Sequence, residues 1–148
     1  RIKAFGWHLM VQFNSREIND YAEILRAIET DYIIDHIGKF MPPVDVNDPR
    51  VDQILSLLDR GNAWVKICGG YETSLSGGPD YADVSPIAKR IIQHAPERVI
   101  WGSNWPHVAV PREQYPNDAE QLDALLDWAD ERARQKILVD NPAVLYGF

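Results

Sequence analysis

The stretch Tyr32-Ile33-Ile34-Asp35-His36-Ile37-Gly38 places three apolar residues directly before an acid, a histidine and a glycine. Consecutive apolar residues without alternation are typical of a strand that is covered on both faces, as in a parallel sheet. Gly38 allows the backbone to turn sharply where such a strand ends. The stretch therefore predicts a buried strand that delivers two ionisable side chains, Asp35 and His36, to its carboxyl end.

Strands of this kind alternate with amphipathic helices along the chain. Phe5–Phe13 is a mostly apolar run and is predicted as the preceding strand, and Asn14 with Glu17 forms a capping box for the helix after it. Downstream, Asp48 and Pro49 begin a helix that Gly61 ends. The same pattern predicts strands at 63–68 and 98–102, helices at 85–95, 118–129 and 131–138, and a last helical turn from 141 to 147.

Single helices between consecutive strands require parallel pairing through right-handed crossovers. Four such strands fit either an open doubly wound sheet or part of a closed (β/α) barrel. No Gly-x-Gly-x-x-Gly follows the first strand, which disfavours dinucleotide binding. Polar clusters follow every strand, as in barrels, whose sites lie at the carboxyl ends of the strands. A complete barrel typically needs about 250 residues, so these 148 residues correspond to roughly half of one.

The composition narrows the classes of partner. Hydrophobic residues make up 45% and charged residues 25% of the chain, as in globular proteins. The net charge of -7 argues against nucleic acid and anionic membranes as partners, and no apolar run reaches the length of a membrane helix. Cys68 is the single cysteine, which excludes an internal disulfide and a cysteine-rich zinc site. We expect a cytoplasmic protein with a small-molecule substrate.

The candidate catalytic residues are His36 and Asn104. A neutral imidazole at His36 could bind a metal, polarise a carbonyl or move a proton near neutral pH, or it could simply hydrogen-bond a loop carbonyl. Asn104 can donate and accept hydrogen bonds, but it cannot act as a carboxylate base. Asp35 is expected to point to the other side of its strand and to be structural. Lys66 lies within an apolar strand, so it must pair with an acid or extend its ammonium to water.

Four further residues are predicted to contact substrate, because the carboxyl ends of barrel strands converge on one mouth. Lys39 offers a positive charge to an anionic substrate, with a solvated lysine as the alternative. His107 follows Asn104 in a polar segment and is either a pocket residue or a loop residue. The other two follow the first and third strands: Gln12 and Tyr71. Glu72 and Thr73, next to Tyr71, are also candidates for pocket contacts.

Several blocks of the sequence, in this order, resemble the amidohydrolase-2 family of metal-dependent hydrolases with the TIM-barrel fold, and within it the 2-pyrone-4,6-dicarboxylate lactonases. The resemblance covers nearly the whole chain. The blocks that carry it are Gly6-Trp7-His8, Ile34-Asp35-His36-Ile37-Gly38, Trp64-Val65-Lys66, Arg98-Val99-Ile100-Trp101-Gly102-Ser103-Asn104-Trp105-Pro106-His107 and Asp140-Asn141-Pro142-Ala143-Val144-Leu145-Tyr146-Gly147-Phe148.

The resemblance implies that residues 1–148 are the C-terminal portion of a single barrel domain, with strands five to eight of a (β/α)8 fold. His36 matches the strand-six histidine that contacts the substrate carbonyl or a metal. Lys39 stands where the lactonases often show an arginine that binds a substrate carboxylate. Asn104 stands where they carry the strand-eight aspartate that activates water.

Two departures from the family pattern bear on the chemistry. The His-x-His pair of strand one is absent from this chain, so His36 would be only one ligand of a divalent metal such as zinc or manganese. Zinc sites normally need three protein ligands, and the others would come from the missing half. Asn104 in place of the aspartate can position water through its amide but puts simple water activation in doubt.

The expected function is hydrolysis of a lactone or related cyclic ester of a small carboxylic acid, with His36 acting on the carbonyl and Asn104 orienting water. A metal-dependent decarboxylase of an aromatic acid is the first alternative. The second is a half-barrel without catalytic activity. Four parallel strands leave two open edges, which proteins normally cover, so an N-terminal half or a second copy of the chain is expected to close them.

Overall fold

Four short strands form one parallel sheet, in the order in which they occur along the chain. In the computed structural model, which describes all 148 residues, Ile33 pairs with both Met10 and Trp64, and Lys66 pairs with Ile100. A doubly wound sheet reverses its strand order at a switch point, so the sequential order excludes that alternative. The strands are β1 (Leu9–Val11), β2 (Tyr32–Ile34), β3 (Ala63–Ile67) and β4 (Val99–Trp101).

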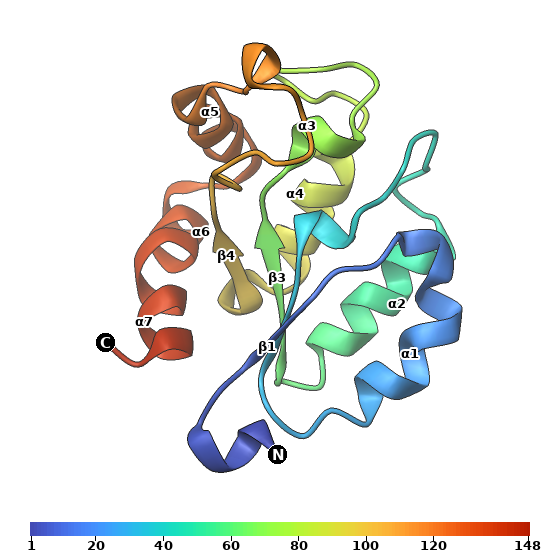
Figure 1. Ribbon diagram of the computed structural model, residues 1–148, viewed down its shortest axis with the longest axis vertical. Helices are drawn as coiled ribbons and strands as arrows, with labels where there is room; N and C mark the ends of the chain where they lie inside the picture. The colour runs from blue at the N-terminus through green and yellow to red at the C-terminus, as the bar shows by residue number, and fades with distance from the viewer.

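Helices follow the strands, and most of them begin at the residues that the sequence predicts. Asn14 and Glu17 form the expected capping box before α1, and the Asp48 carboxylate accepts the Arg50 N–H at the start of α2. Figure 1 shows α1 and α2 beside β1 and β2, and α6 and α7 beside β4. The helices are α1 (Ile18–Arg26), α2 (Pro49–Leu58), α3 (Gly70–Thr73), α4 (Ser85–His94), α5 (Asp118–Trp128), α6 (Glu131–Gln135) and α7 (Asn141–Tyr146).

The two faces of the sheet differ in what covers them. One face packs against the helices in a cluster of 28 buried residues that includes Ile34, Val65 and Val99. The opposite face carries a cluster of three buried residues, Ile33, Trp64 and Ile100, with Leu145 of α7 against it. A sequential parallel sheet with its helices on one face is the architecture of half a TIM barrel, which confirms the predicted fold class.

Two local predictions about secondary structure are wrong, and one short helix lies outside the predictions. The first strand does not extend over Phe5–Phe13, because Ile2–Phe5 forms a 3₁₀ turn that Gly6 ends at φ 68°. Only β2 pairs with β1, so its amino end has no second neighbour to hold it extended. The helix predicted at 131–138 ends at Gln135 and continues as a π-helical turn over Lys136–Asp140. The short helix α3 was not predicted at all.

None of the helices combines the length and the apolarity that crossing a bilayer requires.

Candidate active site

Three loops meet at the carboxyl ends of the strands, and they carry most of the predicted site residues. They follow β2, β3 and β4, and they lie together at the upper end of the sheet in Figure 1. His36, Asn104 and His107 in these loops have positive φ angles of 55°, 65° and 60°. Such angles cost non-glycine residues of order 1–3 kcal/mol and often mark functional sites. The backbone is therefore locally strained at the three residues that carry these side chains.

Gly69 permits the closest approach in this region. A Cβ atom at this position would lie 2.4 Å from His36 Cδ2 and 3.2 Å from Asn104 Nδ2. The residue also has φ +64°, which glycine adopts at little cost. Any side chain here would push His36 away from Asn104, so glycine is required for their contact.

The side chain of Asn104 joins His36 to the loop after β3. Its Nδ2 donates to Glu72 Oε1 at 2.8 Å and to Tyr71 Oη at 2.9 Å, and its Oδ1 lies 3.1 Å from His36 Nε2. An ionised carboxylate only accepts hydrogen bonds, so the amide nitrogen must face Glu72 and the amide oxygen must face His36. His36 therefore carries its proton on Nε2, while its buried Nδ1 has no hydrogen-bond partner.

Glu72, a candidate pocket contact from the sequence, lies at the centre of this cluster. Its side chain is 8% exposed, and Oε1 also lies 3.4 Å from His36 Nε2. Oε2 pairs with Lys39 Nζ at 3.2 Å. The sequence indicated the residue but not its helix, because α3 is four residues long and follows Gly69 with no apolar repeat to predict it. Two adjacent residues of α3, Tyr71 and Glu72, thus contact the same amide.

His107 extends the network away from Asn104. Its Nδ1 lies 3.1 Å from Tyr71 Oη, and its Nε2 lies 3.1 Å from Asp118 Oδ1 at the start of α5. The imidazole is buried, at 3% exposure, and packs edge-on against Tyr71 and Tyr115. Burial raises the pKa of Tyr71 to about 12, so its hydroxyl is protonated at neutral pH.

Asp35 and Lys66 form an ion pair beside His36. Lys66 Nζ lies 3.2 Å from Asp35 Oδ1, so the lysine pairs with an acid, as one of its two predicted arrangements required. Asp35 Oδ2 lies 3.7 Å from His36 Nδ1, and the Cys68 thiol donates to Oδ1 at 3.1 Å. The expectation that Asp35 points away from the site is therefore wrong, because the strand ends one residue before it and Asp35 caps the turn that follows.

Burial and the neighbouring groups shift the pKa of Asp35 in opposite directions. Burial opposes its ionisation, but Cys68, His36 and Lys66 together outweigh burial and lower the pKa of Asp35 below its usual value. Burial also raises the pKa of the Cys68 thiol, with the Asp35 charge adding to the effect. Asp35 is therefore a carboxylate and Cys68 a neutral thiol at neutral pH.

A divalent cation does not fit this group of residues. Asp35, His36 and Cys68 place potential ligand atoms within 4.8 Å of one another, and the unpartnered His36 Nδ1 is one of them. However, the Lys66 ammonium and the Cys68 thiol both already engage Asp35 Oδ1, and the thiol would have to lose the proton that it donates before it could bind a metal. The potential metal ligands Asp35 and Cys68 are therefore already engaged, one by the Lys66 charge and the other by its own thiol proton.

The predicted substrate contacts divide into two groups. Lys39, Tyr71 and His107 all belong to the network around Asn104, and Lys39 keeps 26% of its side chain exposed. Gln12 follows β1 with an exposed side chain and makes no hydrogen bond to the network. The structure thus brings together three of the four at one end of the sheet, next to His36.

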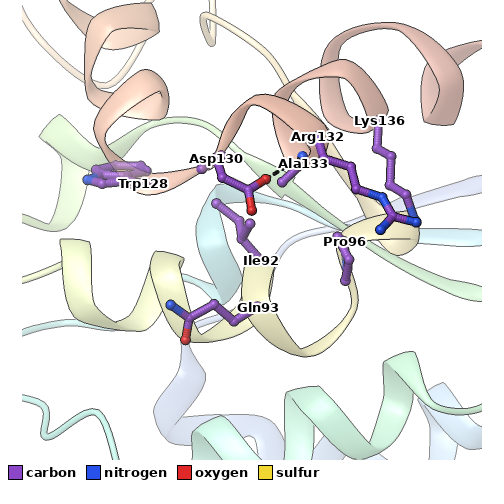
Figure 2. Close-up of a pocket in the computed structure, with 9 residues that line it drawn as sticks. Ile92, Gln93, Pro96, Trp128, Asp130, Arg132, Ala133 and Lys136 are labelled. Carbon is purple, nitrogen blue, oxygen red and sulfur yellow. Dashed lines mark hydrogen bonds between the residues drawn. The ribbon is translucent and has the colours of Figure 1, made fainter.

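The pocket of about 500 Å³ shown in Figure 2 lies elsewhere, between α4 and α6 on the helical side of the sheet. It includes the end of α4 that leads into β4, which is the end opposite the strand carboxyl termini. Two of its charged groups have structural partners: Asp130 accepts the Ala133 N–H at the start of α6, and Lys136 faces Glu97 at 3.8 Å. The pocket is therefore separate from the network around Asn104.

Comparison with known proteins identifies the family of the chain. The model of the amidohydrolase family (Amidohydro_2) matches residues 1–148, which is the whole chain. The chain belongs to the amidohydrolase family. It is 40% identical over 148 residues to D-galactarolactone isomerase from Agrobacterium fabrum and 37% identical over 143 residues to 4-sulfomuconolactone hydrolase from Hydrogenophaga intermedia. These matches cover 99% and 95% of this chain but 50% and 47% of the relatives, so this amidohydrolase chain spans about half their length.

Solved structures of related proteins superpose on nearly the whole of this chain and on about half of their own length. The apo structure of ATU3138 from Agrobacterium tumefaciens has a TM-score of 0.92 at 40% identity, and it is matched over 100% of this chain and 52% of its own. A putative 2-pyrone-4,6-dicarboxylic acid hydrolase from Pseudomonas putida has a TM-score of 0.81 at 27% identity, over 99% of this chain and 54% of its own. An amidohydrolase from Burkholderia multivorans with bound zinc, 18% identical, shares the fold with a TM-score of 0.71.

Proposed function

We propose that the protein containing this chain hydrolyses a lactone or related cyclic ester of a small carboxylic acid, and that the loops after β2, β3 and β4 carry part of its active site. The observation that supports the proposal most is the hydrogen bond between His36 Nε2 and Asn104 Oδ1, with the buried Glu72 Oε1 in contact with both side chains. The two relatives named above act on lactones, according to their names.

In the proposed reaction, His36 acts on the carbonyl of the lactone. Its Nε2–H donates to Asn104 Oδ1 while the site is empty. When a lactone carbonyl oxygen approaches, the Nε2–H turns to that oxygen and stabilises the negative charge that develops on it. The amide oxygen of Asn104 is then free to accept a hydrogen bond from the attacking water. His36 and Asn104 therefore exchange one hydrogen bond for two that assist the reaction.

Lys39 binds an acidic group of the substrate in this proposal. An ammonium group has three donors, and the single contact to Glu72 at 3.2 Å leaves two for a substrate carboxylate. The names of two related proteins include sulfo and dicarboxylic acid groups. Tyr71, His107 and Gln12 remain predicted contacts, with Gln12 reaching the substrate from β1.

Incubation of the complete protein with a panel of lactones in ¹⁸O-labelled water tests the proposal. Hydrolysis adds one labelled oxygen to the carboxylate of the opened product, which mass spectrometry detects. The panel includes a galactarolactone, a sulfomuconolactone and 2-pyrone-4,6-dicarboxylate. Failure to open any lactone of the panel would contradict the proposal. Release of carbon dioxide from an aromatic acid under the same conditions would favour the decarboxylase alternative.

Two substitutions test the assigned roles. His36→Ala removes the carbonyl contact, and we expect kcat to fall by about 10²-fold or more, whereas His94→Ala on α4 removes a surface histidine as a matched control. Asn104→Asp introduces the carboxylate that the lactonases carry. Because Glu72 Oε1 lies 2.8 Å from Asn104 Nδ2, the new charge would face a second carboxylate, and we expect activity to fall. A rise in kcat for Asn104→Asp would contradict this view of the site.

Lactone isomerisation is the second candidate function, because the 40% identical relative from Agrobacterium fabrum is an isomerase. A hydroxyl group of the substrate would then attack the carbonyl in place of water. The product would be a rearranged lactone that contains no ¹⁸O from the solvent. The same incubation therefore distinguishes the two functions.

We also propose that the sheet is completed by further strands, either from an N-terminal half of the same barrel or from a second copy of this chain. Only β2 pairs with β1, and Met10 on β1 remains 53% exposed. Size-exclusion chromatography of the isolated chain tests the need for closure. A stable monomer at 16.9 kDa would contradict it.

A further inference from the structure

We infer that Tyr71, His107 and Asp118 form a proton relay that serves as the base of the reaction in place of the absent carboxylate at Asn104. The inference rests on the proposed function and names the group that takes the proton from the attacking water. It starts from the direction of four consecutive hydrogen bonds, which the carboxylates of Glu72 and Asp118 fix from the two ends.

The direction follows from the two carboxylates at the ends. Because the Glu72 carboxylate accepts only, Asn104 Nδ2 faces Glu72 and also donates to Tyr71 Oη at 2.9 Å. At the other end, the Asp118 carboxylate lies 3.1 Å from His107 Nε2 and can only accept, so the neutral imidazole carries its proton on Nε2. His107 Nδ1 is then an acceptor, and the tyrosine hydroxyl donates to it at 3.1 Å. The chain of donors therefore runs from Asn104 through Tyr71 and His107 to Asp118.

This order of groups is that of a hydroxyl, a histidine and an acid in a catalytic triad. Tyr71 Oη has a second lone pair that neither Asn104 nor His107 uses. When water attacks the carbonyl carbon, a water proton moves to Tyr71 Oη and the tyrosine proton moves to His107 Nδ1. The new C–O bond forms, the ring C–O bond breaks, and the imidazolium returns the proton through Tyr71 to the released ring oxygen. No proton is gained or lost overall.

The surroundings of Tyr71, His107 and Asp118 suit each residue to its role in the relay. The burial that raises the pKa of Tyr71 to about 12 keeps it a hydroxyl, so it passes a proton on without holding a negative charge. His107 is 3% exposed, and the rings of Tyr71 and Tyr115 fix its orientation. The Asp118 side chain is 49% exposed and stabilises the imidazolium while in contact with water. Asp118 acts through His107 and is a positioning residue.

Glu72 is the rival base, and its contacts argue against it. One oxygen accepts from Asn104 and the other pairs with Lys39, so both are engaged in holding neighbouring groups.

Gln121 holds Asp118 in place, which independently supports its role in the relay. Its amide donates to Asp118 Oδ1 at 3.0 Å and to the Ser103 carbonyl at 3.1 Å, which ties the start of α5 to the loop that carries Asn104.

Kinetics of the complete protein on a lactone that it converts test the relay. Tyr71→Phe and His107→Gln should lower kcat by about 10²- to 10⁴-fold, the usual range for general-base catalysis. Asp118→Asn should lower kcat by about tenfold or more while KM stays within about twofold, because Asp118 lies behind His107 and not against substrate. Asp123→Asn makes the same charge change at an exposed position of α5 and should leave both constants unchanged.

Nitrogen-15 NMR of the histidines gives a second measurement that does not depend on turnover. We expect His107 in the neutral tautomer with the proton on Nε2, and its Nε2–H signal should shift in Asp118→Asn. A proton on Nδ1 would reverse the chain of donors and overturn the relay. Unchanged kcat in Tyr71→Phe would overturn the relay while leaving the proposed function intact. Absence of any lactone conversion by the wild-type protein would overturn both.

Discussion

The two faces of the sheet contrast in both composition and consequence. The helix-covered face buries 28 residues in one cluster that is almost wholly aliphatic and aromatic. The opposite face buries three apolar residues and then, nearer the carboxyl ends of the strands, an ion pair between Asp35 and Lys66. Apolar burial is the main source of folding free energy, whereas a buried ion pair contributes little net stability. The contrast shows that the helix-covered face supplies most of the folding free energy, whereas the opposite face holds the charged pair of Asp35 and Lys66 next to the site.

The same contrast explains where strain is tolerated. Non-glycine residues with positive φ include His36, Asn104 and His107, all at the carboxyl ends of the strands. None of the residues in the strands themselves has such an angle. A rigid core can hold strained loops, and the loops in turn carry side chains at angles that an unsupported chain would not keep.

The largest expected effect comes from breaking the ion pair on the inner face. Lys66→Met leaves the buried Asp35 charge without its partner, and we expect a loss of about 3–5 kcal/mol of unfolding free energy. Denaturant unfolding of the complete protein measures it. The double variant Asp35→Asn, Lys66→Met removes both charges and should recover most of the loss. Equal destabilisation by the single and double variants would show that the ion pair is not the cause.

A core truncation on the helix-covered face should come next. Leu57 has no exposed surface, and Leu57→Ala should cost about 3 kcal/mol through lost burial and the cavity left behind. Unlike substitutions at the strand ends, it should leave KM and kcat of the folded protein within about twofold. A large kinetic change without loss of stability would mean that the two faces are not independent.

Gly69→Ala should affect activity more than stability. The added methyl group overlaps His36 Cδ2, and displacement of a reacting group by about 1 Å typically costs about 10²-fold in rate. Steady-state kinetics detect the loss, and thermal unfolding reports the smaller cost of alanine at positive φ. Gly77→Ala also places a methyl group at positive φ but meets no neighbouring atom, so it serves as the matched control. Comparable activity in the two variants would contradict the contact between His36 and Asn104.

The smallest expected effect is the loss of unfolding free energy at low pH through Asp35. The folded pKa of Asp35 is lowered, so its carboxylate adds stability that is fully present above the unfolded value of about 3.9 and is lost as pH falls below it. Unfolding free energy measured between pH 6 and pH 3 should therefore decline more steeply in the wild-type protein than in the Asp35→Asn, Lys66→Met variant. Parallel curves would contradict this assignment. The helix-covered cluster contains no carboxylate and should add no such slope.

Much of the fold followed from periodicity and capping. The bounds of β2 agree with the quoted apolar run, and the caps at Asn14 and Asp48 lie before α1 and α2 as predicted. These features are local, since they depend on neighbours within a few residues. The amino end of β1 failed because its extension depends on a second neighbouring strand, which lies beyond the reach of a local pattern.

Prediction of the site was less complete. His36 and Asn104 could be selected because they follow apolar strands directly, and they lie 3.1 Å apart. Asp35 was misplaced because its orientation depends on the turn that it caps. Asp118 was missed because it lies at the start of α5 and does not follow a strand. Glu72 was only one of several candidates, because its place between His36 and Asn104 depends on an unpredicted helix of four residues.

The sequence by itself determined the order of strands and helices, the parallel sheet and the end of the sheet at which chemistry-bearing residues gather. Its apolar spacing and caps fix these features through short-range contacts. Only the tertiary structure decided that Asn104 lies between His36 and Glu72, that Lys66 neutralises Asp35, and that His107 reaches Asp118. Those contacts join residues that are far apart in the chain, and their geometry depends on how three strand-end loops turn above one packed sheet.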